Sequence, residues 1–177
     1  MRKLLALATV LVAAIALPAA ASAAVAPGTY GPNAGSFNSA NAPGSSHLTS
    51  GSPSCTVNAD LSISCTSYVL GGVGHTNATV SLAANYSATI NCTNHGGNLV
   101  ESHTTTFSAS SSATVASTRN GQLSVPARSA SPFSAPQVCP NPNWTPSIAP
   151  GTLTLNSFTY TLTFAGFTSP YITISQP

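Results

Sequence analysis

Charged side chains are almost absent from this chain, which has four basic and two acidic residues among 177. Arg2 and Lys3 belong to a leader that we expect to be removed, so two arginines remain against Asp60 and Glu101, with a net charge near zero. Binding to nucleic acid or to an anionic membrane surface needs clustered Lys and Arg. We therefore expect neither partner, and no apolar segment after the leader approaches the length of a membrane span.

The scarcity of ionisable groups also limits catalysis. Asp60 and Glu101 are the only carboxylates available to orient four histidines, and no G-x-S-x-G nucleophile motif occurs. A carboxylate pair for glycoside cleavage would have to be these same two residues. The sequence thus favours a non-enzymatic protein without a cofactor, with a secreted hydrolase as an alternative.

The first 23 residues have the pattern of a secretory signal peptide. Arg2 and Lys3 precede an apolar run from Leu4 to Leu17, which is shorter than the roughly 20 residues that span a bilayer, and Ala21-Ser22-Ala23 forms a cleavage pattern. We expect a secreted, extracellular protein, with retention at the cell wall left open. Residues 24–53, rich in Pro, Gly, Ser and Asn, predict a flexible lead-in, and residues 54–177 predict one domain.

Alternation of apolar and polar residues with a period of two recurs along the domain. In NATVSLAANYSATINC the apolar residues take the even positions from Val80 to Cys92, which predicts a long, half-buried strand. Leu153 and Leu155 are odd, whereas the apolar residues from Phe158 to Phe164 are even. A bulge near Asn156-Ser157 would keep all of them on the core face.

Asn120-Gly121 is the strongest hairpin signal in the chain, and it would pair residues 113–119 with residues 122–126. About eight strands are expected in all. They favour an all-β fold, a two-sheet antiparallel sandwich of immunoglobulin-like architecture with two disulfides. Trp144 follows Cys139 instead of lying between paired cysteines, so the likeness to immunoglobulin domains is architectural only.

An even number of cysteines in an exported chain predicts two disulfides, for which three pairings exist. The four cysteines are Cys55, Cys65, Cys92 and Cys139. Pairing Cys55 with Cys65 in a hairpin also sets Val57 opposite Ile63, so the register of apolar residues agrees with this bond. By elimination, Cys92 pairs with Cys139 and holds the Pro-rich passage from 126 to 150, which cannot form regular central strands.

The segment INCTNHGGNLVESH brings one cysteine, two histidines and one carboxylate together. A zinc site here would use Cys92, His95 and His103, with Glu101 as ligand or base. A cysteine in a disulfide cannot ligate zinc, which argues against any metal site. We expect instead a turn at 94–98, after which Glu101 and His103 share one face of the returning strand as a solvated ion pair.

Aromatic and hydroxyl side chains offer other contacts for a ligand. Trp144, in the loop CPNPNWTPS, is the best surface candidate, because parity assigns the aromatic residues from Phe158 to Phe164 to the core. Thr159, Thr161 and Thr163 form a hydroxyl row on the opposite face, which suits a flat ligand but is also ordinary for a solvated sheet. The candidate ligand contacts are Trp144, His95 and His103.

Three stretches resemble a group of small exported proteins common in actinobacteria. They are CTVNADLSISCTSYVLGGVGHTNATVSLAANYSATINCTNHGGN, CPNPNW and SFTYTLTFAGFTSPYITI, which together span 54–174. The group has no assigned activity, so the resemblance implies export, disulfides and a β-rich fold, and no catalytic residue. The chain is also similar to the apoproteins that carry enediyne chromophores, in the spacing of Cys55 and Cys65. The second cysteine pair of those apoproteins closes another short loop, which Cys92 and Cys139 would not.

These observations lead to two expectations about function. The first is an exported, non-enzymatic protein that acts by surface binding to a cell-envelope component, a protein or a glycan. The second is a carrier of a small apolar ligand, held between the sheets or against the Pro-rich loop.

Overall fold

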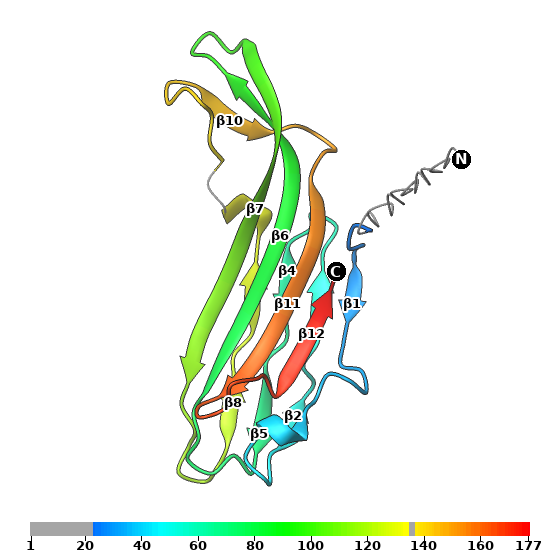
Figure 1. Cartoon of the computed structure of the whole chain (residues 1–177), viewed down its shortest axis with the longest axis vertical. Coiled ribbons are helices and arrows are strands. Elements are labelled where there is room, and N and C mark those ends of the chain that lie inside the picture. Colours follow the sequence, from blue (N-terminus) through cyan, green and yellow to red (C-terminus); the bar gives the residue numbers. More distant parts are fainter. Residues whose placement is uncertain (1–22, 135–136) are drawn as a thin grey trace, which may run out of the picture.

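The computed structural model describes residues 23–134 and 137–177, so the predicted signal peptide lies, except for its last residue, outside the described residues. The described chain is all-β, with antiparallel sheets and two 3₁₀ turns (Figure 1). The elements are β1 (Gly28–Tyr30), η1 (Ser39–Asn41), β2 (His47–Gly51), β3 (Cys55–Val57), β4 (Ile63–Cys65), β5 (Tyr68–Gly71), β6 (Ala78–Thr93), β7 (Leu99–Val115), β8 (Leu123–Val125), β9 (Arg128–Ala130), η2 (Pro132–Ser134), β10 (Thr145–Ile148), β11 (Thr154–Phe164) and β12 (Ile172–Gln176).

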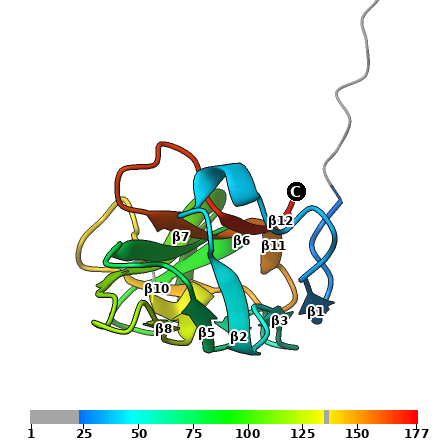
Figure 2. The same ribbon diagram turned by 90° about the horizontal axis from the view of Figure 1, so that it is seen from below.

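The strands form three hydrogen-bonded sheets. One has the order β1-β3-β4-β9, one has the order β2-β5-β8, and the largest has the order β10-β6-β11-β12 with β7 paired to the other side of β6. Figure 2 shows the strands of the largest sheet on one side of the molecule and those of the two smaller sheets on the other.

The described residues contain twelve strands, so the prediction of about eight was too low. Most of the difference arises because three chain segments, 47–57, 63–71 and 123–130, are each interrupted midway and so count as two strands. Pro53 and Pro126 lie at two of the breaks, where they cannot donate to a ladder. At the third break the Thr66 hydroxyl accepts a hydrogen bond from the Ser54 amide, 3.0 Å away.

The long strand β6 confirms the predicted alternation, since its residues from Ala78 to Cys92 are buried at every even position. In β11 the register against β6 shifts between Leu155 and Ser157, which confirms the bulge. Leu155 and the even residues from Phe158 to Phe164 are all buried. The bulge places one extra residue in β11 and thereby returns both halves of the strand to the same core face.

One hydrophobic core joins strands from all three sheets. Its largest fully buried side chains are aromatic residues of the largest sheet, such as Tyr86, Phe158 and Phe164. The hydroxyl groups of Tyr68 in β5 and Tyr160 in β11 meet in the interior at 3.0 Å. The interior between the layers is therefore filled by packed aliphatic and aromatic side chains.

The hairpin predicted around Asn120-Gly121 is only partly correct. The turn forms, with Gly121 at φ 70° and the Thr118 amide bonded to the Gln122 carbonyl at 2.7 Å. However, β8 pairs with β5 and not with β7, so its residues do not face 113–119. The turn passes the chain from one layer to the other, where β8 buries Leu123 and Val125 against the core.

The passage 24–53, expected to be a flexible lead-in, instead contributes two strands. β1 pairs with β3, and β2 pairs with β5. The Val25 amide bonds to the Leu155 carbonyl at 2.8 Å, and Phe37 bridges to Ile172. Backbone pairing therefore ties this polar segment to the domain, even though every residue of β2 is exposed.

Both predicted disulfides are present, Cys55–Cys65 and Cys92–Cys139. In the short hairpin Cys55 lies opposite Cys65 and Val57 opposite Ile63, in the expected register. The Pro-rich passage contains β10, which includes Pro146 and pairs only with β6. An edge position of this kind is where a strand proline is tolerated.

Candidate functional site

The hairpin of β6 and β7 continues beyond the opposing layer and forms an arm at one end of the molecule (Figure 1). The core-facing side chains of β6 in this arm, Ala88, Ile90 and Cys92, form a separate small cluster. The loop carrying Cys139 covers this cluster, and Trp144 packs against it. Trp144, expected to be exposed, is thus half-buried, because the Cys92–Cys139 bond draws its loop onto the arm.

The two candidate histidines also lie on this arm. His95 is exposed in the turn between β6 and β7, where Asn94 accepts hydrogen bonds from the amides of Gly96 and Asn98. His103 lies on β7, with its Nδ1 atom 3.5 Å from Glu101 Oε1, and both side chains are about one-third exposed. The expected turn therefore forms, and Glu101 and His103 lie on one face of β7 as predicted, but His103 Nδ1 is buried and has no hydrogen-bond partner. No contact among the described residues joins Trp144, His95 and His103 into one site.

The outer face of the largest sheet carries an almost continuous array of hydroxyl and amide side chains, here called the hydroxyl face. It is formed by the outward positions of β6, β7, β11 and β12, which lie in register as rows across the sheet. The rows are Thr114, Thr79 and Thr163; Ser112, Ser81, Thr161 and Thr173; Ser110, Ala83, Thr159 and Ser175; and Ser108, Asn85 and Ser157. These rows contain no charged residue and no aromatic residue.

Hydrogen bonds between strands fix several of these side chains. The hydroxyl groups of Ser81 and Ser112 are 2.9 Å apart. Asn85 bridges three strands, because its Oδ1 accepts from the Ser108 hydroxyl at 2.7 Å and its Nδ2 donates to Ser157 Oγ at 3.1 Å. The face is therefore ordered and presents donors and acceptors at regular spacing, about 4.8 Å between strands and about 6.8 Å along a strand.

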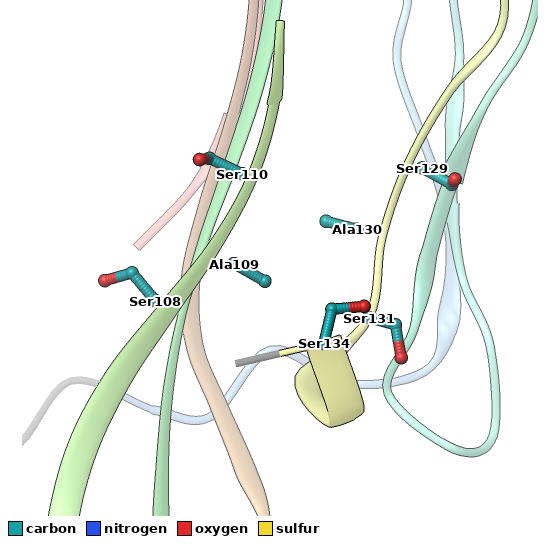
Figure 3. Close-up of a pocket in the computed structure, with 7 residues that line it drawn as sticks. All are labelled: Ser108, Ala109, Ser110, Ser129, Ala130, Ser131 and Ser134. Carbon is teal, nitrogen blue, oxygen red and sulfur yellow. The ribbon is translucent and has the colours of Figure 1, made fainter. Parts of the chain in front are cut away.

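A second feature is a slot at the edge of the molecule, between β7 of one layer and β9 of the other, with a volume of about 330 Å³. Figure 3 shows Ala109 and Ala130 directed toward each other across it, with Ser131 and Ser134 at one end. The hydroxyl groups of Ser108 and Ser110 point away from the slot, so the backbone of β7 forms that wall. The slot is lined by Ser108, Ala109, Ser110, Ser129, Ala130, Ser131 and Ser134.

Arg128 lies beside this slot, directly before Ser129 in β9. One of its terminal nitrogen atoms, Nη1, donates to Ser111 Oγ at 3.4 Å, across the gap between the layers. Its Nε atom is buried and has no hydrogen-bond partner. The sequence offered one signal for this residue, namely that it is one of only two arginines after the leader, and sequence reasoning did not use it.

Within residues 23–134 and 137–177, no group of three or more His, Cys, Asp or Glu side chains is arranged to hold a metal ion. The same residues contain no helix that is both long and apolar enough to cross a membrane. Comparison with protein-family models, with curated proteins and with solved structures finds no match to this chain. The candidate features are therefore supported by their geometry alone.

Proposed function

We propose that this chain is an exported, non-enzymatic binding protein whose hydroxyl face contacts a glycan of the cell envelope. The observation that carries the proposal is the ordered, uncharged array of Ser, Thr and Asn side chains over four strands. Each hydroxyl both donates and accepts hydrogen bonds, and each amide carries two donors and an acceptor. Sugar hydroxyls have the same dual character, so the two surfaces are chemically complementary.

The composition of this face favours a glycan over a protein partner. Cores of protein interfaces are enriched in aromatic residues, Met and Arg, and the rows of the hydroxyl face contain none of these. With no aromatic ring for a sugar to stack on, each contact is weak. Useful affinity then comes from many contacts along a repeating polymer, which the regular spacing of the rows suits.

We also propose that the protein acts outside the cell. A leader with the pattern of residues 1–23 would deliver the chain outside the cell, where both disulfides are stable. We further propose that the two layers form a two-sheet sandwich of immunoglobulin-like architecture, with the interrupted segments acting as one sheet. We also propose that this chain belongs to the group of small exported actinobacterial proteins that it resembles.

A co-sedimentation experiment tests the glycan contact. The purified chain without residues 1–23 is mixed with insoluble cell-wall polysaccharide and with cellulose, and the bound fraction is measured. Thr159→Lys places a long charged side chain in the middle row of the hydroxyl face and should reduce binding. Ser124→Lys makes the same kind of change at an exposed position of β8, in the other layer, and should leave binding unchanged. Equal binding by both variants, or no binding by the unmodified chain, would refute the proposal.

A carrier of a small ligand is the second candidate, and the slot between β7 and β9 favours it. Buried side chains from all three sheets fill the core, and the slot offers a small ligand a place at the edge between the layers. A ligand retained through purification and detected by native mass spectrometry would support this candidate over glycan binding.

A further inference from the structure

β7 is a long edge strand of the largest sheet. It has 17 residues and pairs with β6 on one side, and no strand among the described residues pairs with its other side. The Ala149 amide donates to the Thr89 carbonyl on the β10 side of β6, so the backbone groups of the odd residues of β6 point to that side. The even residues of β6 therefore bond to β7, where their partners are odd, such as Ala109 opposite Ala84. The N–H and C=O groups of the even residues in 102–114 then point to the open edge of β7.

Two other sheet edges carry features that block further pairing, whereas β7 carries none. Beside β12, residues 36–38 bond to the backbone of Tyr171 and Thr173 and so cover that edge. The edge formed by β8 and β9 is interrupted at Pro126. Between 102 and 114, β7 contains no Pro and no Asp, Glu, Lys or Arg. Proline and charged side chains on an edge prevent pairing between molecules, so their absence makes β7 an edge that can accept a partner strand.

The slot between β7 and β9 gives this edge a shape that one large side chain can fill. Ala109 and Ala130 are directed toward each other across it, and its volume is about 330 Å³ (Figure 3). Phe107, two positions away on the same face of β7, is only partly buried. Phe133, in the 3₁₀ turn that lines one end of the slot, is 66% exposed. The edge therefore presents apolar surface as well as free backbone groups.

We infer that two copies of this chain form a dimer, in which the β7 strands pair antiparallel across a two-fold axis at Ser108. In this register the even residues in 102–114 form seven hydrogen-bonded pairs with two bonds each, and all of their outward side chains are Ser or Thr. Phe107 of one copy lies opposite Ala109 of the other, where the slot receives its ring. Glu101 lies opposite Val115, so no like charges meet.

The order of large and small residues along β7 favours a second copy over an extended peptide of another protein. Phe107 and Ala109 are two positions apart on one face, so an antiparallel copy brings both large-and-small pairs together at once. An axis at Phe107 would set two rings against each other. An axis at Ala109 would set two alanines together and place each ring opposite Ser111, away from the slot. The axis at Ser108 is therefore the one that fills both slots.

Pairing at β7 also joins the hydroxyl faces of the two copies, because the outward rows continue across the axis. The dimer does not require a glycan, so it can form where glycan binding fails, and glycan binding can occur without it. A Phe107 ring in the slot would exclude a carried ligand from the same space.

The test is the oligomeric state of the chain without residues 1–23, measured by sedimentation velocity over a dilution series in the absence of glycan. We expect a dimer that dissociates on dilution. A monomer at every concentration, or a monomer that retains a peptide from the expression host, would overturn the inference.

Two matched variants test the register, in which Thr106 of each copy lies opposite Ser110 of the other. Thr106→Lys with Ser110→Lys sets like charges against each other at both places and should raise the dimer dissociation constant about tenfold. Thr106→Lys with Ser110→Glu sets opposite charges there and should leave the dimer at least as stable. Within one copy these exposed positions are about 14 Å apart along the strand, so both variants should keep the circular dichroism of the unmodified chain. Equal dissociation constants in the two variants, whether high or low, would overturn this register.

Ser110→Pro provides a second measurement, which does not depend on the folding of the charged variants. It removes an N–H group that points to the open edge and not to β6, a position where a strand proline is tolerated. The variant should fold and form a weaker dimer. A dimer of unchanged stability would overturn pairing at β7.

Discussion

The hydroxyl oxygens of Tyr68 and Tyr160 lie 3.0 Å apart in the buried core and join β5 to β11, which belong to different layers. Tyr68 is 3% exposed and Tyr160 is 1% exposed. Two polar groups are thus satisfied by each other where water is excluded. The pair also fixes the relative position of the layers in a way that aliphatic contacts would not.

Removing one hydroxyl of this pair should destabilise the protein more than removing both. Tyr160→Phe leaves the Tyr68 hydroxyl buried without its partner, at a cost of about 1–3 kcal/mol. Combining Tyr160→Phe with Tyr68→Phe removes the orphan group and should recover part of that loss. Urea unfolding of the two single variants and the double variant measures the coupling. Strictly additive effects would show that the hydrogen bond contributes nothing.

Alkaline pH should unfold the protein before its buried tyrosines ionise. Burial raises the pKa of Tyr68 and of Tyr160, and it raises the pKa of Tyr86 to about 12. The folded state therefore keeps phenol protons that the unfolded chain releases near pH 10, so stability is full below about pH 10 and falls as the pH rises above it.

The phenolate absorbance and the circular dichroism, measured together against pH, test this expectation. The phenolate absorbance of the buried tyrosines should rise only where the circular dichroism shows that the protein unfolds. Full ionisation of the five tyrosines near pH 10 with the fold intact would contradict the assignment of these phenols to the core.

Loss of the Cys92–Cys139 bond should release the loop that carries Trp144. Trp144 is the chain's single tryptophan and packs against the small cluster at Cys92, so its fluorescence reports this contact. Cys92→Ser with Cys139→Ser should shift the emission to longer wavelength and cost up to about 4 kcal/mol in the chain-entropy model. Cys55→Ser with Cys65→Ser should lower stability, by up to about 3 kcal/mol, without moving the emission of the folded protein. A shift of equal size in both variants would contradict local release.

Deleting Asn156 should be tolerated. It is the extra residue of the bulge, and without it Leu155 and Phe158 are two positions apart and still share the core face. We expect a cost of about 1 kcal/mol, by comparison with ordinary point changes. Deleting Thr159 is the matched control, since it moves the following apolar residues to the solvent face and should prevent folding. Thermal denaturation of the two deletion variants distinguishes these outcomes, and equal stability would show that the bulge does not set the register.

Local patterns predicted the local structure well. The parity of β6, the bulge in β11 and the register of the Cys55–Cys65 hairpin each depend on residues close together in sequence, where a period of two decides which face is buried. The pairing of Cys92 with Cys139 followed once the hairpin had used the other two cysteines. Predicting these features required no information about how distant segments of the chain pack.

Partners of short strands could not be predicted in the same way. The sequence Asn120-Gly121 specifies a turn, but the destination of β8 depends on the exposed edge that β5 offers in the other layer. The passage 24–53 is too polar to indicate burial, and its order comes from backbone bonds to β3 and β5. The amino-acid composition of a segment does not predict which strand it pairs with.

In the candidate sites, too, local features could be predicted from the sequence, whereas contacts between distant segments could not. The threonine row of β11 was visible in the sequence, and the odd positions of β6 could have extended it, but only strand register reveals the rows across four strands. Trp144 was placed on the surface because parity assigned the aromatic residues of β11 to the core, whereas the structure packs it against the small cluster at Cys92. The slot between β7 and β9 depends on how these two strands approach across the layers, which no local pattern contains.

Glycan binding by the hydroxyl face is tested most directly by mapping the contact residue by residue. The ¹⁵N-labelled chain is titrated with a soluble fragment of cell-wall polysaccharide, and backbone amide shifts are recorded. We expect the shifts to cluster at the outward positions of β6, β7 and β11, centred on the row of Ser110, Ala83 and Thr159. Shifts confined to β2, β5 and β8, or no shift at any concentration of the fragment, would contradict it.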